Sequence, residues 1–99
     1  MNREKLLNIL SMAARAGRIA SGVTLVAEAI KKRDAKLILM ASDTKEETKK
    51  DIYVLSQKYS LEVCEVLDKE TLGGIIGKAE RAVVAVLDTG FSKAIKRAI

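Results

Sequence analysis

The sequence predicts an α/β protein built as a single-domain three-layer α/β/α sandwich with a small mixed sheet. Three short apolar segments, at residues 36–42, 61–67 and 82–88, alternate with stretches whose apolar residues recur at helical spacing. The first of these segments is too short for a buried helix and lacks alternating polar residues, as in a strand covered on both faces. Strands of this kind, separated by helices, are typical of a sheet enclosed by two helical layers.

The chain is interpreted as one domain spanning residues 1–99. It contains no proline, no Ser/Gly-rich linker and no repeat that would mark an internal boundary. Its 99 residues match the usual size of a single domain, and a hydrophobic content of 48% supplies a core without disulfide bonds.

Five helices are expected, and each has a recognisable start or end. Leucines and alanines at helical spacing precede Gly17, which stands where a helix stops. Residues 18–21 form a short link, and Gly22 opens a second helix that ends in the basic residues 31–33, which suit the negative end of the helix dipole.

The remaining three helices follow the three expected strands. Thr44 and Glu47 have the spacing of a capping box and predict a helix at 45–59. Asp68 is the expected cap of a short helix, and Gly90 leads into the last helix.

Composition excludes several classes of protein. With no histidine and one cysteine, the common nucleophile–base pairs and zinc sites built on cysteines cannot be assembled, so we expect no enzyme, no cofactor and no metal. Cys64 is interpreted as a small buried hydrophobe in a reducing compartment. The longest apolar run, residues 82–87, is far shorter than the ~20 residues of a membrane span. These features favour a cytoplasmic protein that does not enter a membrane.

Charge is unevenly distributed along the chain. Residues 1–36 carry eight basic and three acidic side chains, residues 37–77 carry five and eight, and residues 78–99 carry five and two. Both ends are therefore basic and the middle is acidic. If the ends meet in space, they form a positive face suited to phosphates; an ordinary soluble protein with a modest basic excess is the other interpretation.

The stretch LGGIIGKAER, residues 72–81, has a superficial likeness to a phosphate-binding loop. A P-loop needs four residues between its glycines and a hydroxyl after the lysine, but three residues separate Gly73 from Gly77, and Ala79 replaces the hydroxyl. The stretch is better interpreted as a helix end packed on the sheet, followed by an exposed loop.

A KH-type clamp also fits this stretch poorly. Its two central residues normally face nucleic acid, whereas Ile75 and Ile76 are needed for the buried face of the helix. Binding by stacked aromatics is disfavoured because the chain has two tyrosines, one phenylalanine and no tryptophan. Binding through a helix N-terminus, backbone amides and basic side chains remains.

Three segments together resemble the kink-turn-binding ribosomal protein family, and most of all its YlxQ-type bacterial branch. They are AARAGRIASG (13–22), AKLILMASD (35–43) and LGGIIGKAERAVVAVLDTGF (72–91). The resemblance implies the same three-layer sandwich. It also implies that the N-terminus of the second helix enters the widened groove of a sharply bent RNA, while the loop before the last strand packs over an extruded nucleotide.

Carried over residue by residue, the resemblance places the RNA contacts in two segments and adds a third set. Gly22 and its neighbours must then lie beside the turn at 78–82. The first segment is Ser21, Gly22, Val23 and Thr24, flanked by Arg15 and Arg18; the second is Lys78, Ala79, Glu80, Arg81 and Ala82; Lys31, Lys32 and Arg33 extend the phosphate contacts.

The chain departs from the family pattern at three positions. Family members that bind kink-turns carry Asn, Glu and Lys where this chain has Thr24, Leu25 and Glu28. The resemblance therefore supports RNA binding more than it supports kink-turn recognition.

These arguments lead to a functional expectation with one alternative. We expect a monomeric, non-enzymatic, ribosome-associated protein that binds ribosomal or structured RNA with a bent or looped shape, such as a kink-turn. The alternative is a protein-interaction module that docks a partner through an acidic surface on the helix at 45–59.

Overall fold

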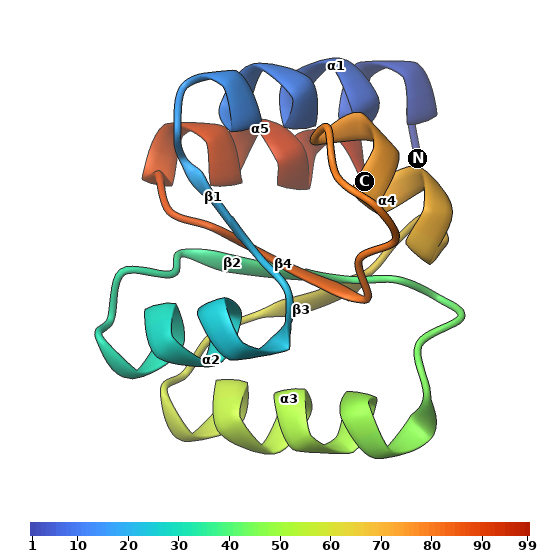
Figure 1. Ribbon diagram of the computed structural model, residues 1–99. Coiled ribbons are helices and arrows are strands. Elements are labelled where there is room, and N and C mark those ends of the chain that lie inside the picture. The colour runs from blue at the N-terminus through green and yellow to red at the C-terminus, as the bar shows by residue number, and fades with distance from the viewer.

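A four-stranded mixed sheet forms the middle layer of the computed structural model, which describes all 99 residues (Figure 1). The strands are β1 (Ile19–Ser21), β2 (Leu37–Met40), β3 (Val63–Glu65) and β4 (Val83–Val86), in the spatial order β1-β4-β2-β3. β4 runs antiparallel to both of its neighbours, and β2 and β3 run parallel. The predicted small mixed sheet is confirmed.

Helices cover both faces of this sheet (Figure 1). One layer contains α1 (Arg3–Arg15), α4 (Lys69–Ile75) and α5 (Thr89–Ala98); the other contains α2 (Val23–Lys31) and α3 (Glu46–Lys58). The three-layer sandwich predicted from the sequence is therefore the observed architecture.

The two central strands explain why the apolar segments lack polar alternation. All four residues of β2 are buried, with Leu37 and Leu39 in the core beneath α1 and α5, and Ile38 and Met40 in the core beneath α2. Successive side chains of a strand point to opposite faces, so a strand between two helical layers needs apolar residues at every position.

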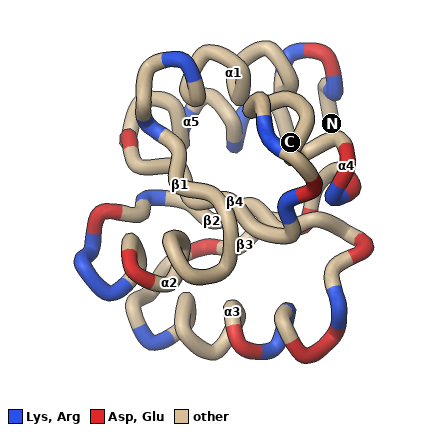
Figure 2. Tube along the Cα trace, viewed as in Figure 1, with Lys and Arg blue, Asp and Glu red and all other residues tan.

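The two basic ends of the chain meet in one layer. α1 and α5 pack side by side, and the amide of Asn2 donates a 2.7 Å hydrogen bond to the carbonyl of Ala98. Figure 2 shows Lys and Arg on both helices and on the segment between α4 and β4. None of the helices has the length and apolarity that crossing a membrane requires.

The structure corrects the predicted link at residues 18–21. Ile19–Ser21 form an edge strand whose partners are Val86, Ala85 and Val84 of β4. Three residues are too few for a recognisable period, and their hydrogen bonds come from a strand about 65 positions away in the chain.

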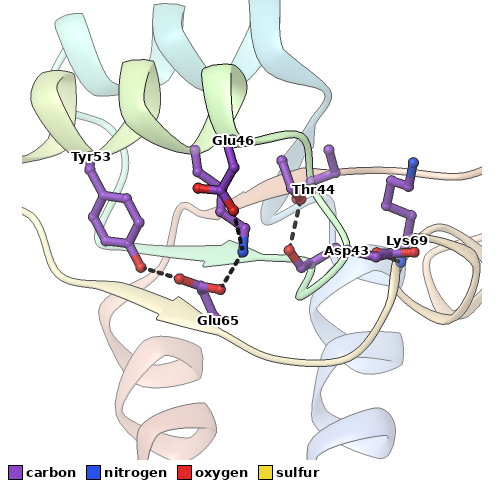
Figure 3. Close-up of polar contacts among 9 residues, drawn as sticks. Asp43, Thr44, Glu46, Tyr53, Glu65 and Lys69 are labelled. Atoms are coloured by element: carbon purple, nitrogen blue, oxygen red, sulfur yellow. Dashed lines mark hydrogen bonds and ion pairs between the residues drawn. The ribbon is translucent and has the colours of Figure 1, made fainter.

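The capping box at Thr44 was a wrong prediction. Lys45 precedes the first turn of α3, and no side chain caps that helix. The Thr44 hydroxyl oxygen lies 2.7 Å from the carbonyl oxygen of Ala41 and 3.2 Å from that of Ala82 (Figure 3). Thr44 is buried, so its hydroxyl serves the contact between the β2–α3 turn and the start of β4.

The other predicted helix boundaries agree more closely with the structure. α1 ends just before Gly17, and the Asp68 carboxylate caps α4 by accepting the Thr71 amide at 2.7 Å. The last helix begins at Thr89 with Asp88 as its cap, so Gly90 lies inside it. Cys64 is half-buried against the core, and burial raises the pKa of its thiol.

Candidate nucleic-acid interface

The junction between β1 and α2 depends on Gly22. Its amide donates a 3.0 Å hydrogen bond to the carbonyl of Val83, which extends the β1–β4 pairing by one residue. Its backbone has φ +89° and ψ 153°, a conformation that is nearly restricted to glycine. The chain can therefore turn from the strand straight into the helix, and another residue at this position would strain the fold as well as any binding site.

The N-terminus of α2 carries backbone donors that have no partner in the chain. Val26 donates the first helical hydrogen bond, to the Gly22 carbonyl, so the amides of Val23, Thr24 and Leu25 remain free. All three residues are exposed. Free amides at the positive end of a helix dipole are suited to bind an anion.

No other helix of the chain presents such a start. Asn2, Asp68 and Asp88 cap α1, α4 and α5 with side-chain oxygens. α3 has no side-chain cap, but Glu46 and Glu47 in its first turn repel anions. α2 has neither a capping side chain nor an acidic residue in its first turn, so only its N-terminus is open to a negatively charged ligand.

Backbone contacts fix the loop between α4 and β4. The Arg81 amide donates to the Lys69 carbonyl at 3.1 Å, and the Ala82 carbonyl accepts the Ala41 amide at 2.8 Å. The Lys69 amide in turn donates to the Asp43 carboxylate at 2.9 Å (Figure 3). The start of α4, the end of β2 and the loop 78–82 are thus joined into one structural unit.

The Arg81 side chain connects this loop to the start of α2. Its Nε donates to the Ser21 hydroxyl oxygen at 3.3 Å, and its Nη1 donates to the Glu80 carbonyl at 2.9 Å. A longer contact of 3.4 Å joins Nη1 to the Ala79 carbonyl. The two donors of Nη2 have no partner, so the guanidinium is held in place while one edge stays available.

Two expected lysines extend this surface along α2. Val23, Thr24, Ala27, Glu28, Lys31 and Lys32 line a shallow open cavity of about 530 Å³. Lys32 pairs with Glu28 at 2.7 Å, and this contact lowers the pKa of the Glu28 carboxyl. The negative charge of Glu28, one of the departures from the family pattern, is therefore compensated, and Lys31 adds an unpaired positive charge.

Three expected arginines lie away from the Ser21–Arg81 contact. The Arg18 carbonyl accepts the Leu87 amide at 2.9 Å, which places Arg18 at the opposite end of β1. Arg15, in the last turn of α1, borders a cavity against the end of α4. Arg33 follows α2, and its guanidinium carbon lies 5.2 Å from the ring centre of Tyr59, a cation–π contact with the end of α3.

The remaining expected residues surround the Arg81 contact. Lys78, Ala79 and Glu80 are exposed on the loop, and the Glu80 carboxylate lies 3.8 Å from the Lys69 ammonium. Leu25 is 55% exposed beside the edge of β1. Its apolar side chain replaces the polar one of the family pattern, but its amide contributes to the free helix start.

Sequence reasoning missed the polar residues that support this site. The sequence pattern predicts Thr44 as a helix cap and assigns Asp43 no role, although both hold the turn beside the loop 78–82. Their signal in the sequence is weak, because a short polar turn after a strand looks the same whether it supports a site or only begins a helix.

The helix α3 differs from the acidic surface expected at 45–59. This segment contains four lysines and three carboxylates, and two of the carboxylates lie in its first turn. Tyr53 donates to the Glu65 carboxylate at 2.7 Å, and Lys49 donates to it at 2.9 Å (Figure 3). These polar contacts fasten α3 to the edge strand β3.

The fold and this site together define a small three-layer α/β/α domain with an uncapped helix start beside a basic loop. The ribosomal protein L7Ae/L30e/S12e/Gadd45 family matches residues 4–96, and the chain belongs to this family.

Similar proteins agree with this assignment. The chain is 34% identical to RNA-binding protein YlxQ of Enterococcus faecium over 98 residues, which cover 99% of this chain and 94% of that protein. It is 37% identical to RNA-binding protein YlxQ of Bacillus subtilis over 84 residues, which cover 85% of this chain and 84% of that protein. The resemblance to the YlxQ-type branch is confirmed.

Two solved structures share the fold. A protein of unknown function from Bacillus halodurans superposes with a TM-score of 0.91 at 34% identity, covering 95% of both chains. The Giardia lamblia 15.5kD RNA binding protein superposes with a TM-score of 0.82 at 15% identity, covering 97% of this chain and 82% of that one. At this low identity, the Giardia structure bears on the fold alone.

Proposed function

We propose that this protein binds a bent or looped structured RNA of the kink-turn type through the N-terminus of α2 and the loop between α4 and β4. The contact of Arg81 with Ser21 carries the proposal, because it holds a guanidinium beside the free amides of α2. Both groups are donors that attract the phosphate and carbonyl oxygens of RNA. The two bacterial relatives, both named RNA-binding proteins, support this class of ligand.

The geometry favours distorted RNA over a regular duplex. A helix start reads RNA from inside a groove, and the major groove of an A-form duplex is too narrow and deep for that. The exposed start of α2, flanked by the loop 78–82, fits a groove already widened by a bend.

We assign the protein a binding role without catalysis, as a monomer in the cytoplasm in association with the ribosome. The ribosomal proteins for which the family is named support the last part of this assignment.

A titration with two RNAs tests the proposal. One is a kink-turn with its sheared G·A pairs, and the other has these pairs replaced by Watson–Crick pairs. We expect tighter binding to the kink-turn, measured by calorimetry or gel shift at one fixed salt concentration. Equal affinity for both RNAs would exclude kink-turn recognition, and no binding to either would exclude RNA binding of this kind.

A second candidate function is the docking of a protein partner on α3. It is favoured by an apolar side chain on the outer surface of this helix, Val54 at 61% exposure. Pull-downs with and without ribonuclease separate the two functions, because a partner bound through α3 remains after the RNA is digested.

A further inference from the structure

We propose that the cavity between the ends of α1 and α4 is a subsite for a single unstacked nucleobase. This inference rests on the proposed function, because it takes the base to belong to the RNA held at the start of α2. The subsite is separate from the Ser21–Arg81 contact and involves a side chain, Arg15, that does not reach that contact.

The cavity has a volume of about 310 Å³ and is open to solvent. Ser11, Ala14 and Arg15 of α1 form one side, and the backbone and side chains of residues 74–77 form the other. Arg15 takes part in none of the ion pairs of the chain, so its guanidinium is free to engage a ligand.

Gly74 leaves open space on the α4 side of the cavity. A β-carbon built at Gly74 meets no atom within 4 Å, and its backbone is not left-handed. Glycine in a helix costs up to about 1 kcal/mol relative to alanine. Neither packing nor conformation inside the chain requires glycine here, so a flat ligand can approach the backbone at this position.

Polar groups at the end of α4, beside the cavity, favour a nucleobase over a phosphate. At the end of α4, the Gly77 amide donates to the Gly74 carbonyl at 3.0 Å and the Lys78 amide to the Gly73 carbonyl at 2.9 Å. The carbonyls of residues 75–77 accept no hydrogen bond in the chain. These acceptors lie at the negative end of the helix and repel a phosphate, whereas a nucleobase offers them N–H donors and offers Arg15 a ring face and acceptors.

The chain links this subsite to the proposed interface. Residues 74–77 run directly into the loop 78–82, which carries Arg81. Residues 74–82 therefore connect the cavity to the loop whose Arg81 contacts Ser21.

The test is a titration of the ¹⁵N-labelled protein with nucleoside 5′-monophosphates and, separately, with ribose 5-phosphate. We expect a saturable shift of the Gly77 amide resonance with the mononucleotides and none with ribose 5-phosphate. Gly74→Leu fills the cavity from a position with free space, and Arg15→Ala removes the guanidinium from an exposed position. Each variant should reduce the mononucleotide response at least severalfold, while the melting temperature shows that it is folded.

Two results would overturn the subsite. One is an equal response to ribose 5-phosphate, which would make the cavity a phosphate site. The other is an unchanged mononucleotide response in both variants.

A parallel titration with kink-turn RNA separates this inference from the proposed function. We expect Gly74→Leu to weaken RNA binding about tenfold, the size of effect that loss of one stacked base produces. If Arg81→Ala weakens RNA binding and Gly74→Leu does not, the subsite is absent and the proposed function stands. If the wild-type protein binds no RNA, the proposed function fails, and the mononucleotide titration still decides the subsite.

Discussion

The carbonyl group of Ala79 lies directly against the α-carbon of Gly73, so that a β-carbon at position 73 would collide with the carbonyl oxygen. Gly73 is buried in α4, and Ala79 belongs to the exposed loop that leads to β4. This contact sets the distance between the helix and the loop, and it explains why glycine occupies a helical position at some cost in stability.

Gly73→Ala should therefore destabilise the protein and displace the loop 78–82. Forcing a methyl group into a filled space typically costs about 1–3 kcal/mol. Urea unfolding measures this loss. Gly74→Ala is the matched control, because its methyl group enters open space and improves helix propensity, so that the free energy of unfolding should stay equal or rise by up to about 1 kcal/mol. Equal losses of unfolding free energy in both variants would contradict the role assigned to the contact between Gly73 and Ala79.

Arg81→Ala should weaken RNA binding and make it less sensitive to salt. If the free edge of the guanidinium meets one phosphate, the slope of log K against log salt falls by about one. Fluorescence polarisation with a labelled kink-turn RNA over a salt series measures the slope. Arg18→Ala is the control, since Arg18 lies at the opposite end of β1. A slope changed by Arg18→Ala but not by Arg81→Ala would place the RNA on a different surface.

Thr44→Val should lower stability by roughly 1 kcal/mol, the net contribution of one hydrogen bond. The substitution keeps the shape of the side chain but removes the hydroxyl that contacts the carbonyls of Ala41 and Ala82. Thr48→Val, on α3 and without a side-chain hydrogen bond, is the comparison and should change stability by no more than about 0.5 kcal/mol. Indistinguishable midpoints of urea unfolding for the two variants would show that the Thr44 hydroxyl contributes nothing.

Tyr53 should titrate at unusually high pH. Its hydrogen bond to the Glu65 carboxylate is the main cause that raises the pKa of Tyr53 to about 12. The chain has no tryptophan, so the ultraviolet absorbance of tyrosinate can be followed over a pH series. We expect Tyr53→Phe to remove a titration step near pH 12 that the wild-type protein shows.

The raised pKa of Tyr53 also determines how the stability of the protein changes with pH. An unfolded tyrosine has a pKa of about 10. Because the folded value is higher, the Tyr53 hydroxyl stabilises the folded state fully below about pH 10, and this contribution is lost as pH rises toward 12. Between these pH values, wild-type protein should lose more stability than Tyr53→Phe. Equal losses of stability in the wild-type protein and in Tyr53→Phe would mean that the hydrogen bond between Tyr53 and Glu65 does not form in solution.

The parts of the fold that could be predicted are those that depend on local pattern. Residues 37–40 and 83–86 are apolar at every position, which marks them as enclosed strands. The edge strand Ile19–Ser21 could not be predicted, because it forms by pairing with β4, which lies far away along the chain. The strand expected at 61–67 is shorter in the structure, where residues 63–65 lie in register with β2.

The candidate site likewise combines features that could be predicted from the sequence with features that depend on long-range contacts. Gly22 and the loop 78–82 could be placed together through the family resemblance, and the contact of Arg81 with Ser21 agrees with that placement. Arg18 could not be placed, because its side of the molecule depends on where β1 begins and on the direction in which it runs. Whether Thr44 caps a helix or supports a loop likewise depends on β4, which lies 39 or more positions further along the chain.

The Gly22–Val83 hydrogen bond fastens the start of α2 to the start of β4, and the Ala41–Ala82 hydrogen bond fastens the loop before β4 to the end of β2. These hydrogen bonds form without a ligand, so we expect the entropy lost on association to fall mainly on the RNA. The observed association rate should then follow how fast the free RNA bends, and Mg²⁺, which helps structured RNA to fold, should accelerate capture without altering the protein.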